Sequence, residues 1–364
     1  MIPLADINRQ DKEIKKEIED EIKRVLESGW FILGKELEGF EKEFAEYCGK
    51  KFGVGVGNGT DAIFLALKSF DIGKGDEVIT VANTAIPTVS AIVATGAKPI
   101  LVDCGEDYLI DVEKIEEKIT SKTKAIIPVH LYGQVCDMGK ILELGEKYDL
   151  NVIEDCAQAH GAELNEKKVP IGKIGCFSFY PSKNLGAYGD GGMIITDDEN
   201  LNEKLKLLRN YGQTGVYSSI ISGYNSRLDE IQSAILKTKL KYLNKWNRQR
   251  IEIAEEYNKK LNCEKPKIGS NKKHIFHLYV IRNKKREGLI EYLKLKGITT
   301  KIHYPIPIHL QKGFEFLGYS VGDFPMSEKF SKEILSLPMF PELKKEEIEK
   351  VCEEINLFNT TSSC

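Results

Sequence analysis

One lysine in a glycine-rich stretch is the clearest candidate for chemistry in this sequence. Lys183 lies between Ser182 and Asn184 in CFSFYPSKNLGAYGDGG, residues 176–192, with aromatic residues before it and several glycines after it. An apolar pocket disfavours the ammonium form, which lowers the pKa of a lysine and makes its amine a usable nucleophile. This stretch alone leaves two interpretations open, a Schiff-base lysine and an ordinary solvated lysine beside a turn.

A second candidate is the turn GNGTDA, residues 57–62, which closes a short apolar strand and opens a helix. A helix N-terminus offers unpaired N–H groups and the positive end of the helix dipole, so Gly59 and Thr60 present a phosphate site. The turn also satisfies the GxGxxA dinucleotide pattern, but the acids Asp76 and Glu77 precede the next strand instead of following it. A plain turn with a Thr or Asp helix cap explains the residues about equally well.

The third candidate is Asp155, which ends the apolar strand NVIED at residues 151–155. Open α/β sheets bind ligands at the carboxyl ends of their parallel strands, where a carboxylate can hold a protonated ring nitrogen. A helix-capping aspartate is the alternative. A phosphate turn, an acid on a strand end and a lysine amine are together what pyridoxal 5′-phosphate (PLP) requires, so the combination predicts a PLP site.

Short apolar strands separated by helices must position these three groups. The expected helices include segments near residues 111–119 and 137–148. The expected strands share an apolar, partly β-branched composition and lie at residues 52–57, 78–82, 99–103, 125–130, 151–155, 176–180 and 191–196. This alternation predicts an α/β fold whose sheet is largely parallel, with a mixed strand, and buried on both faces.

The chain is too long for one compact core, and its pattern changes after a helical stretch at residues 227–261. We predict two domains. Residues 1–245 form a large cofactor-binding domain that begins with a helical segment, and residues 246–364 form a smaller α+β domain.

Composition argues against several classes of function. The formal net charge is −3 and no broad basic surface is indicated, which argues against nucleic-acid binding. No apolar run is long enough to span a membrane, and the first residues lack a signal-peptide core. The eight cysteines contain no CxxC pair, so we expect buried, reduced thiols in a cytoplasmic protein and no metal site.

Four long blocks of the chain resemble the DegT-like family of fold-type I sugar aminotransferases, in order and at family-like spacing. The blocks are GNGTDA, EDCAQAHGA, GCFSFYPSKNLGAYGDGG and GYNSRLDEIQSA, and the resemblance extends over nearly the whole chain. It implies an aspartate-aminotransferase-like large domain with a mostly parallel mixed sheet and a smaller α+β C-terminal domain. It also implies a homodimer whose two active sites lie at the subunit interface.

The resemblance assigns roles to single residues around PLP. Lys183 corresponds to the Schiff-base lysine and Asp155 to the partner of the pyridine nitrogen, while Gln158 corresponds to the residue over or beside the ring. The expected phosphate ligands are Gly59, Thr60 and Ser178.

Two further positions concern the partner subunit and the cofactor ring. Asn225, in GYNSR, corresponds to an asparagine that reaches the phosphate from the other subunit. Ala85 stands where many family members stack an aromatic side chain on the ring, so the cover of that face is left open.

The stretch KIHYPIPIHLQ, residues 301–311, is similar to one in members that aminate C3 of nucleotide-linked sugars. It implies that Tyr304 and His309 lie near the sugar, although a histidine satisfied by turn backbone is the alternative for His309. The favoured reaction converts a dTDP-3-keto-6-deoxyhexose to the amino sugar with L-glutamate as donor. A C4-keto sugar or a UDP-linked 3-keto sugar is the closest competitor.

Two other classes of function stay open on the sequence alone. One is an NAD-dependent sugar oxidoreductase that uses the GxGxxA turn, and the other is a non-catalytic regulator that keeps the fold. Relatives with histidine at the lysine position act as sugar dehydratases, so Lys183 favours transamination.

Overall fold

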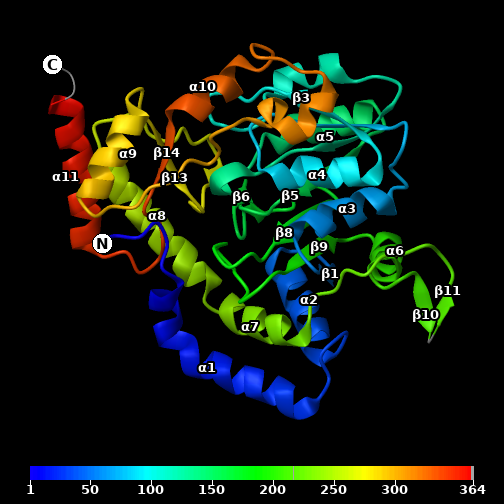
Figure 1. Ribbon diagram of the computed structural model, residues 1–364. Coiled ribbons are helices and arrows are strands. Elements are labelled where there is room, and N and C mark those ends of the chain that lie inside the picture. Colours follow the sequence, from blue (N-terminus) through cyan, green and yellow to red (C-terminus); the bar gives the residue numbers. More distant parts are fainter. Residues whose placement is uncertain (216, 362–364) are drawn as a thin grey trace.

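A seven-stranded sheet forms the centre of the computed structural model, which describes residues 1–215 and 217–361 (Figure 1). Its strands are β1 (Phe52–Val56), β2 (Glu77–Val81), β3 (Lys98–Val102), β4 (Thr123–Ile127), β5 (Asn151–Asp155), β8 (Ile174–Ser178) and β9 (Gly192–Thr196). Their spatial order is β1-β9-β8-β5-β4-β2-β3. Only β9 runs antiparallel to its neighbours β1 and β8, and the other adjacent pairs are parallel. The expected mostly parallel sheet with a mixed strand is therefore confirmed.

Helices bury both faces of this sheet, as its nearly continuous apolar strands require. One face packs against α3 (Gly59–Ser69), α4 (Ile86–Thr95) and α6 (Glu199–Arg209). The other packs against α2 (Lys35–Tyr47), α5 (Met138–Lys147) and α7 (Glu230–Leu240). A short hairpin, β10 (Gln213–Gly215) and β11 (Ser218–Ser219), projects from the body of the protein beyond α6 (Figure 1).

The segment expected to be a helix near residues 111–119 instead forms two 3-10 turns, η1 (Val112–Lys114) and η2 (Glu116–Lys118). Within this segment only Ile115 is buried. A short α-helix depends on packing of an apolar face, and a single buried residue does not supply one.

A second, smaller core surrounds a two-stranded antiparallel sheet. The strands are β13 (Tyr279–Arg282) and β14 (Ile334–Leu337), and the helices are α8 (Leu243–Lys260), α9 (Arg286–Leu295) and α11 (Lys345–Thr361). Ile2 belongs to this core: its N–H donates to the Gly297 carbonyl, and the Leu4 carbonyl accepts from Met339. The predicted boundary at residue 245/246 falls inside α8 and stays a prediction, but the first residues of the chain pack with the second core.

The described residues also form seven further elements, most of them short. They are β6 (Glu163–Leu164), β7 (Lys167–Lys168), β12 (Lys272–Lys273), α10 (Pro325–Glu333), η3 (Leu131–Gly133), η4 (Ile308–Leu310) and η5 (Lys312–Leu317). Strand β12 pairs with β6, which follows β5 of the seven-stranded sheet in the chain. The N-terminus of α10 is held by the carboxylate of Asp103, which accepts from the Met326 and Ser327 N–H groups.

Two sequence expectations concern features spread along the whole chain. In the part of the chain that the structure describes, no helix is both long and apolar enough to cross a bilayer. The seven described cysteines are unpaired, and all except the half-buried Cys263 are buried.

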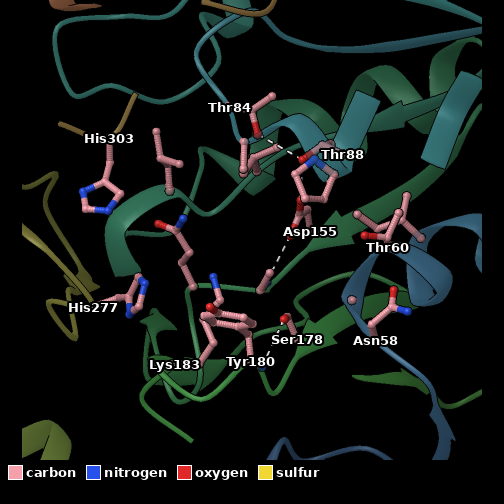
Figure 2. Close-up of a pocket in the computed structure, with 18 of the residues that line it drawn as sticks. Asn58, Thr60, Thr84, Thr88, Asp155, Ser178, Tyr180, Lys183, His277 and His303 are labelled. Carbon is pink, nitrogen blue, oxygen red and sulfur yellow. Dashed lines mark hydrogen bonds between the residues drawn. The ribbon is translucent and has the colours of Figure 1, made fainter. Parts of the chain in front are cut away.

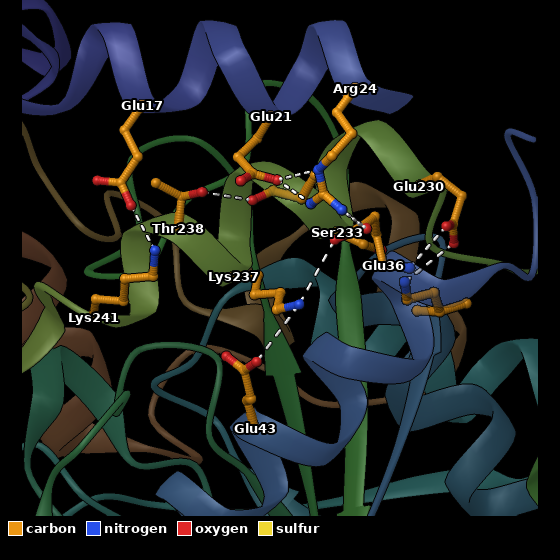
Figure 3. Close-up of polar contacts among 12 residues, drawn as sticks. Glu17, Glu21, Arg24, Glu36, Glu43, Glu230, Ser233, Lys237, Thr238 and Lys241 are labelled. Carbon is orange, nitrogen blue, oxygen red and sulfur yellow. Dashed lines mark hydrogen bonds and ion pairs between the residues drawn. The ribbon is translucent and has the colours of Figure 1, made fainter. Parts of the chain in front are cut away.

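Helix α1 (Ile7–Ser28) lies along α7 and is held by apolar and ionic contacts. Ile14 and Ile18 pack against Ile235 and Trp246 in one cluster. Around that cluster, ion pairs join Glu17 to Lys241, Arg24 to Glu36, and Lys237 to both Glu36 and Glu43 (Figure 3).

Glu230 at the start of α7 caps the N-terminus of α2. Helix α2 begins after Gly34, which has no side chain to cap it, and Glu230 supplies the missing acceptor. Its buried carboxylate accepts from the N–H groups of Gly34, Glu36 and Leu37 at 2.9, 2.9 and 3.1 Å (Figure 3). A residue nearly 200 positions away thus satisfies backbone donors that a local cap would ordinarily satisfy.

We expect Glu230→Ala to destabilise the protein by about 2–4 kcal/mol, because three buried N–H groups lose a charged acceptor. Glu43→Ala is the matched control on the same helix pair. It removes an exposed ion pair of 3.6 Å, and exposed pairs contribute about 1 kcal/mol or less. Urea unfolding followed by circular dichroism measures both, and equal losses would contradict the capping role of Glu230.

Candidate active site

A cavity of about 390 Å³ opens at the carboxyl ends of β1, β2, β4, β5 and β8 (Figure 2). Open α/β sheets bind ligands at this edge. The cavity brings together seven of the residues singled out from the sequence: Gly59, Thr60, Asp155, Gln158, Ser178, Lys183 and Tyr304. Ala85 lines it as well.

The turn between β1 and α3 presents backbone donors to the cavity. Asn58 is the N-cap, since its side-chain oxygen accepts from the Asp61 N–H at 2.9 Å, so neither Thr60 nor Asp61 is used as the cap. The N–H groups of Gly59 and Thr60 lie in the first turn of α3, where no intrahelical partner exists. A Cβ atom on Gly59 would lie 2.6 Å from the Cβ of Ser178, so glycine lets this turn touch the end of β8. The backbone donors, together with the hydroxyls of Thr60 and Ser178, suit a phosphate group.

Asp155 is a buried carboxylate with few partners of its own. It accepts from the Ala157 N–H at 3.0 Å and from the Thr88 hydroxyl at 2.8 Å, and Thr84 in turn contacts Thr88. Burial raises the pKa of Asp155, and these donors and the charge of Lys183 oppose that shift. A cationic ring N–H placed against this carboxylate would compensate its loss of hydration.

Lys183 lies in the loop after β8, next in the sheet to the strand that carries Asp155 (Figure 2). Its backbone N–H donates to the Tyr180 carbonyl at 2.8 Å, which fixes the turn. Burial lowers the pKa of Lys183 to about 8, and Asp155 partly opposes the shift. A substantial fraction of the amine is therefore neutral near physiological pH, as a nucleophile and proton carrier requires.

Gln158 connects the edge of the seven-stranded sheet to the C-terminal part of the chain. Its side-chain oxygen accepts from the Tyr132 N–H at 2.7 Å, and its amide nitrogen donates to the Tyr304 hydroxyl at 3.0 Å. The Tyr132 hydroxyl in turn donates to the carbonyl of His303. Residues 303 and 304 are thereby held against the cavity, although they belong to the C-terminal part of the chain.

The cavity also contains polar residues that were not expected from the sequence: Thr84, Thr88, His277 and His303. A sequence signal existed for the threonines, which flank Ala85 directly after a predicted strand. His303 precedes Tyr304 in the stretch already singled out. His277 lies in an apolar strand-like segment that gave no indication of a site.

Two expected site residues lie outside the cavity of this chain. Asn225 is exposed. His309 is buried, its Nε2 lies 3.1 Å from a carboxylate oxygen of Glu328, and its ring packs against Phe324. Its expected contact with the sugar stays a prediction, which this position does not favour. The alternative, in which turn backbone is the partner of His309, is not what the structure shows, because the partner is the carboxylate of Glu328.

One group of side chains, His130, Glu154 and Cys156, has the composition of a metal site. The Nδ1 of His130 accepts from the Cys136 N–H at 3.1 Å, so its proton resides on Nε2, which donates to Glu154 at 2.9 Å. Glu154 also accepts from the N–H groups of Ile171 and Gly172. His130 and Glu154 thus belong to a hydrogen-bond network next to Asp155 on β5.

The residues of the cavity fit PLP on three counts. Free N–H groups and hydroxyls at one end suit a phosphate, and a buried carboxylate without a cationic hydrogen-bond partner suits a protonated ring nitrogen. An amine with a lowered pKa suits the aldehyde. The sequence profile of the DegT/DnrJ/EryC1/StrS aminotransferase family matches residues 12–356.

The chain belongs to the DegT/DnrJ/EryC1/StrS aminotransferase family. A relative from Aneurinibacillus thermoaerophilus, dTDP-3-amino-3,6-dideoxy-alpha-D-galactopyranose transaminase, is 50% identical over 98% of this chain and 99% of its own length. DesV from Streptomyces venezuelae, solved in complex with a ketimine intermediate, has a TM-score of 0.97 and 40% identity over 98% of both chains. NtdA from Bacillus subtilis, solved with bound cofactor PMP, has a TM-score of 0.87 and 33% identity over 94% of this chain and 81% of its own. Membership in this aminotransferase family and a structural neighbour solved with PMP support PLP as the cofactor.

We expect capture of PLP by the cofactor-free protein to follow the neutral fraction of Lys183. Below a pKa of about 8 this fraction rises about tenfold per pH unit, and above it the rate should level off. Borohydride trapping at each pH gives the rate, and mass spectrometry should find the pyridoxyl group on the Lys183 peptide and none in Lys183→Ala. A rate that rises until the ordinary lysine pKa of about 10.4 would contradict the lowered value.

Proposed function

We propose that this aminotransferase converts a nucleotide-linked keto sugar to the amino sugar with L-glutamate as donor. The observation that carries the proposal is the amine of Lys183, whose pKa is lowered by burial and which shares one cavity with the buried Asp155 and the open N–H groups of Gly59 and Thr60. An NAD-dependent oxidoreductase has no use for such a lysine, and a non-catalytic regulator has no use for its lowered pKa.

Bound PLP would supply an electron sink for the carbanion formed during transamination. Asp155 would keep the ring nitrogen protonated, and Gly59, Thr60 and Ser178 would hold the phosphate. Gln158, fixed by Tyr132 and Tyr304, would hold one side of the ring in place.

Proton movement would fall to Lys183. In the first half-reaction its neutral Nζ would take the proton from the α-carbon of L-glutamate. In the second half-reaction its ammonium form would give a proton to the sugar carbon that receives the amine. A pKa of about 8 suits both roles, because both protonation states are then populated near neutral pH.

The favoured substrate is a dTDP-3-keto-6-deoxyhexose. It is supported by the A. thermoaerophilus relative, whose name gives a dTDP-linked 3-amino-3,6-dideoxy sugar, and by Tyr304, whose hydroxyl lies at the cavity. A C4-keto sugar and a UDP-linked 3-keto sugar are the alternatives. The unpaired thiols support a cytoplasmic setting for this reaction.

A panel of dTDP-, UDP- and GDP-linked 3- and 4-keto sugars tests the substrate. We expect one 2-oxoglutarate for each amino sugar formed, with the largest kcat/KM for the dTDP-3-keto-6-deoxyhexose. Chromatography and mass spectrometry of the products identify the aminated carbon. Lys183→Ala is the control and should form no product. Preference for a UDP-linked or 4-keto sugar would select the corresponding alternative, and no turnover with any sugar would reject the proposed function.

We further propose a homodimer in which Asn225 of the partner subunit completes the phosphate site. Support comes from the exposure of this residue and its place outside the cavity of its own chain. Its neighbour Ser226 is bonded to Gly57 and Asp61, so the segment is fixed in position.

Coexpression of two variants tests this arrangement: Lys183→Ala lacks the amine, and Asn225→Ala lacks one proposed phosphate contact and should lower turnover. In a heterodimer of Lys183→Ala and Asn225→Ala, one of the two sites would combine an intact lysine with an intact asparagine from the other chain. Coexpression should therefore restore turnover to about half of the wild-type value per heterodimer, because one site of two is complete. If Asn225 served the site of its own chain, no heterodimer site would be complete and turnover would stay low.

A further inference from the structure

His277 forms part of the cavity wall without a role in the scheme above. It lies just before β13, in the C-terminal part of the chain, and is 7% exposed (Figure 2). Its Nδ1 lies 3.1 Å from the side-chain oxygen of Asn184, the residue after Lys183. The loop that carries Lys183 and the C-terminal part of the chain therefore meet at this histidine.

A chain of hydrogen bonds determines which nitrogen of His277 carries the proton. Asn247 of α8 donates from its amide nitrogen to the His160 carbonyl at 2.7 Å, so its amide oxygen faces Asn184. Asn184 donates to that oxygen at 2.8 Å and to the Ile275 carbonyl at 3.3 Å, so its own oxygen faces His277. Carbonyls only accept, so the His160 carbonyl fixes the orientation of Asn247 and the Ile275 carbonyl that of Asn184. The Nδ1 of His277 must therefore be the donor.

The other ring nitrogen, Nε2, is consequently an acceptor. It makes no hydrogen bond within the part of the chain that the structure describes, and it is not among the fully enclosed polar atoms without a partner. Burial is the main cause that lowers the pKa of His277 well below its ordinary value. The neighbouring charged and titratable groups, Lys183, Arg250, His303 and His160, lower it further. The ring thus stays neutral and presents a lone pair to the cavity.

Helix α8 holds this acceptor in place. One guanidinium nitrogen of Arg250, three residues after Asn247, donates to the carbonyls of Phe276, His277 and Met339 at 3.3, 3.4 and 2.9 Å. Asn247 is hydrogen-bonded to the loop that carries Lys183, and Arg250 is hydrogen-bonded to the backbone of His277. The distance between that loop and His277 is therefore set by two residues of one helix. Such support from packed neighbours is what a specificity contact requires.

We propose that the Nε2 of His277 accepts a hydrogen bond from a hydroxyl group of the keto sugar, which makes His277 a specificity-determining residue. This inference rests on the proposed function. L-glutamate offers carboxylates, which cannot donate to a neutral acceptor, and its amino group must reach the ring. A sugar offers hydroxyl donors, and a site with an unpaired acceptor discriminates against analogues that lack the matching donor.

Two variants and two half-reactions test the inference. Both His277→Phe and His277→Gln remove the Nδ1 donor to Asn184, but only His277→Gln retains an acceptor oxygen, so comparison of the two variants isolates the acceptor. We expect His277→Phe to lower kcat/KM for the keto sugar about 10-fold and His277→Gln less. Single-turnover formation of 2-oxoglutarate from L-glutamate should agree within about twofold between the two variants, because both lose the bond to Asn184 and that half-reaction does not use Nε2.

Deoxy analogues identify the hydroxyl. For the analogue that lacks the contacting hydroxyl, His277→Gln and His277→Phe should have the same kcat/KM, whereas they should differ for every other analogue. A wild-type protein that carries out both half-reactions while His277→Phe and His277→Gln have the same kcat/KM for the keto sugar overturns the inference and leaves the proposed function intact. A wild-type protein that transfers no amino group overturns both.

Nitrogen NMR of ¹⁵N-histidine-labelled protein gives a readout independent of turnover. Between about pH 6 and pH 8 we expect His277 to show a protonated Nδ1 and an unprotonated Nε2, with the signal assigned by its loss in His277→Gln. A ring protonated on Nε2, or one that becomes charged in this range, overturns the inference.

Discussion

The burial of two ionisable groups in one cavity is the constraint on which this structure depends. Asp155 and Lys183 both lose hydration at the sheet edge, and burial pushes each of them toward its neutral form. Each also favours the charged form of the other, so neither is as costly to bury as it would be alone. The parallel pairing of β5 and β8 places the two groups on adjacent chain segments. The sheet order, the capped turn before α3, and the bonds of Thr84 and Thr88 all maintain this arrangement.

The two cores contribute different parts of the cavity. The sheet edge supplies the residues suited to a phosphate and a pyridine ring, whereas the C-terminal part of the chain supplies His277, His303 and Tyr304. Helix α8 spans both and bonds to each through Asn247 and Arg250. A substitution that shifts α8 would therefore change the distance between the cofactor part and the substrate part of the site.

Features of the site that depend on neighbouring residues could be predicted from the sequence, whereas features that depend on contacts between distant residues could not. The turn at Gly59 and Thr60, the strand-end Asp155 and the loop of Lys183 are local patterns, and they were found. The bond from Thr88 to Asp155 joins residues 67 positions apart, and that from Gln158 to Tyr304 joins residues 146 apart. Such bonds depend on the order of the strands in the sheet and on how the C-terminal part of the chain packs against it. The 3-10 turns around Ile115 differ from the expected helix for the same reason, because tertiary burial and not periodicity decides their form.

The burial of Ile2 in the second core has a consequence for synthesis on the ribosome. All strands of the large sheet have been made once residue 196 has emerged, so that unit can begin to fold early. Ile2 must wait for β13, β14 and α11, and α11 contains the last residues that the structure describes. Residues that precede the large sheet are thus placed only after elements that follow it have been made, so the second core assembles later than the sheet.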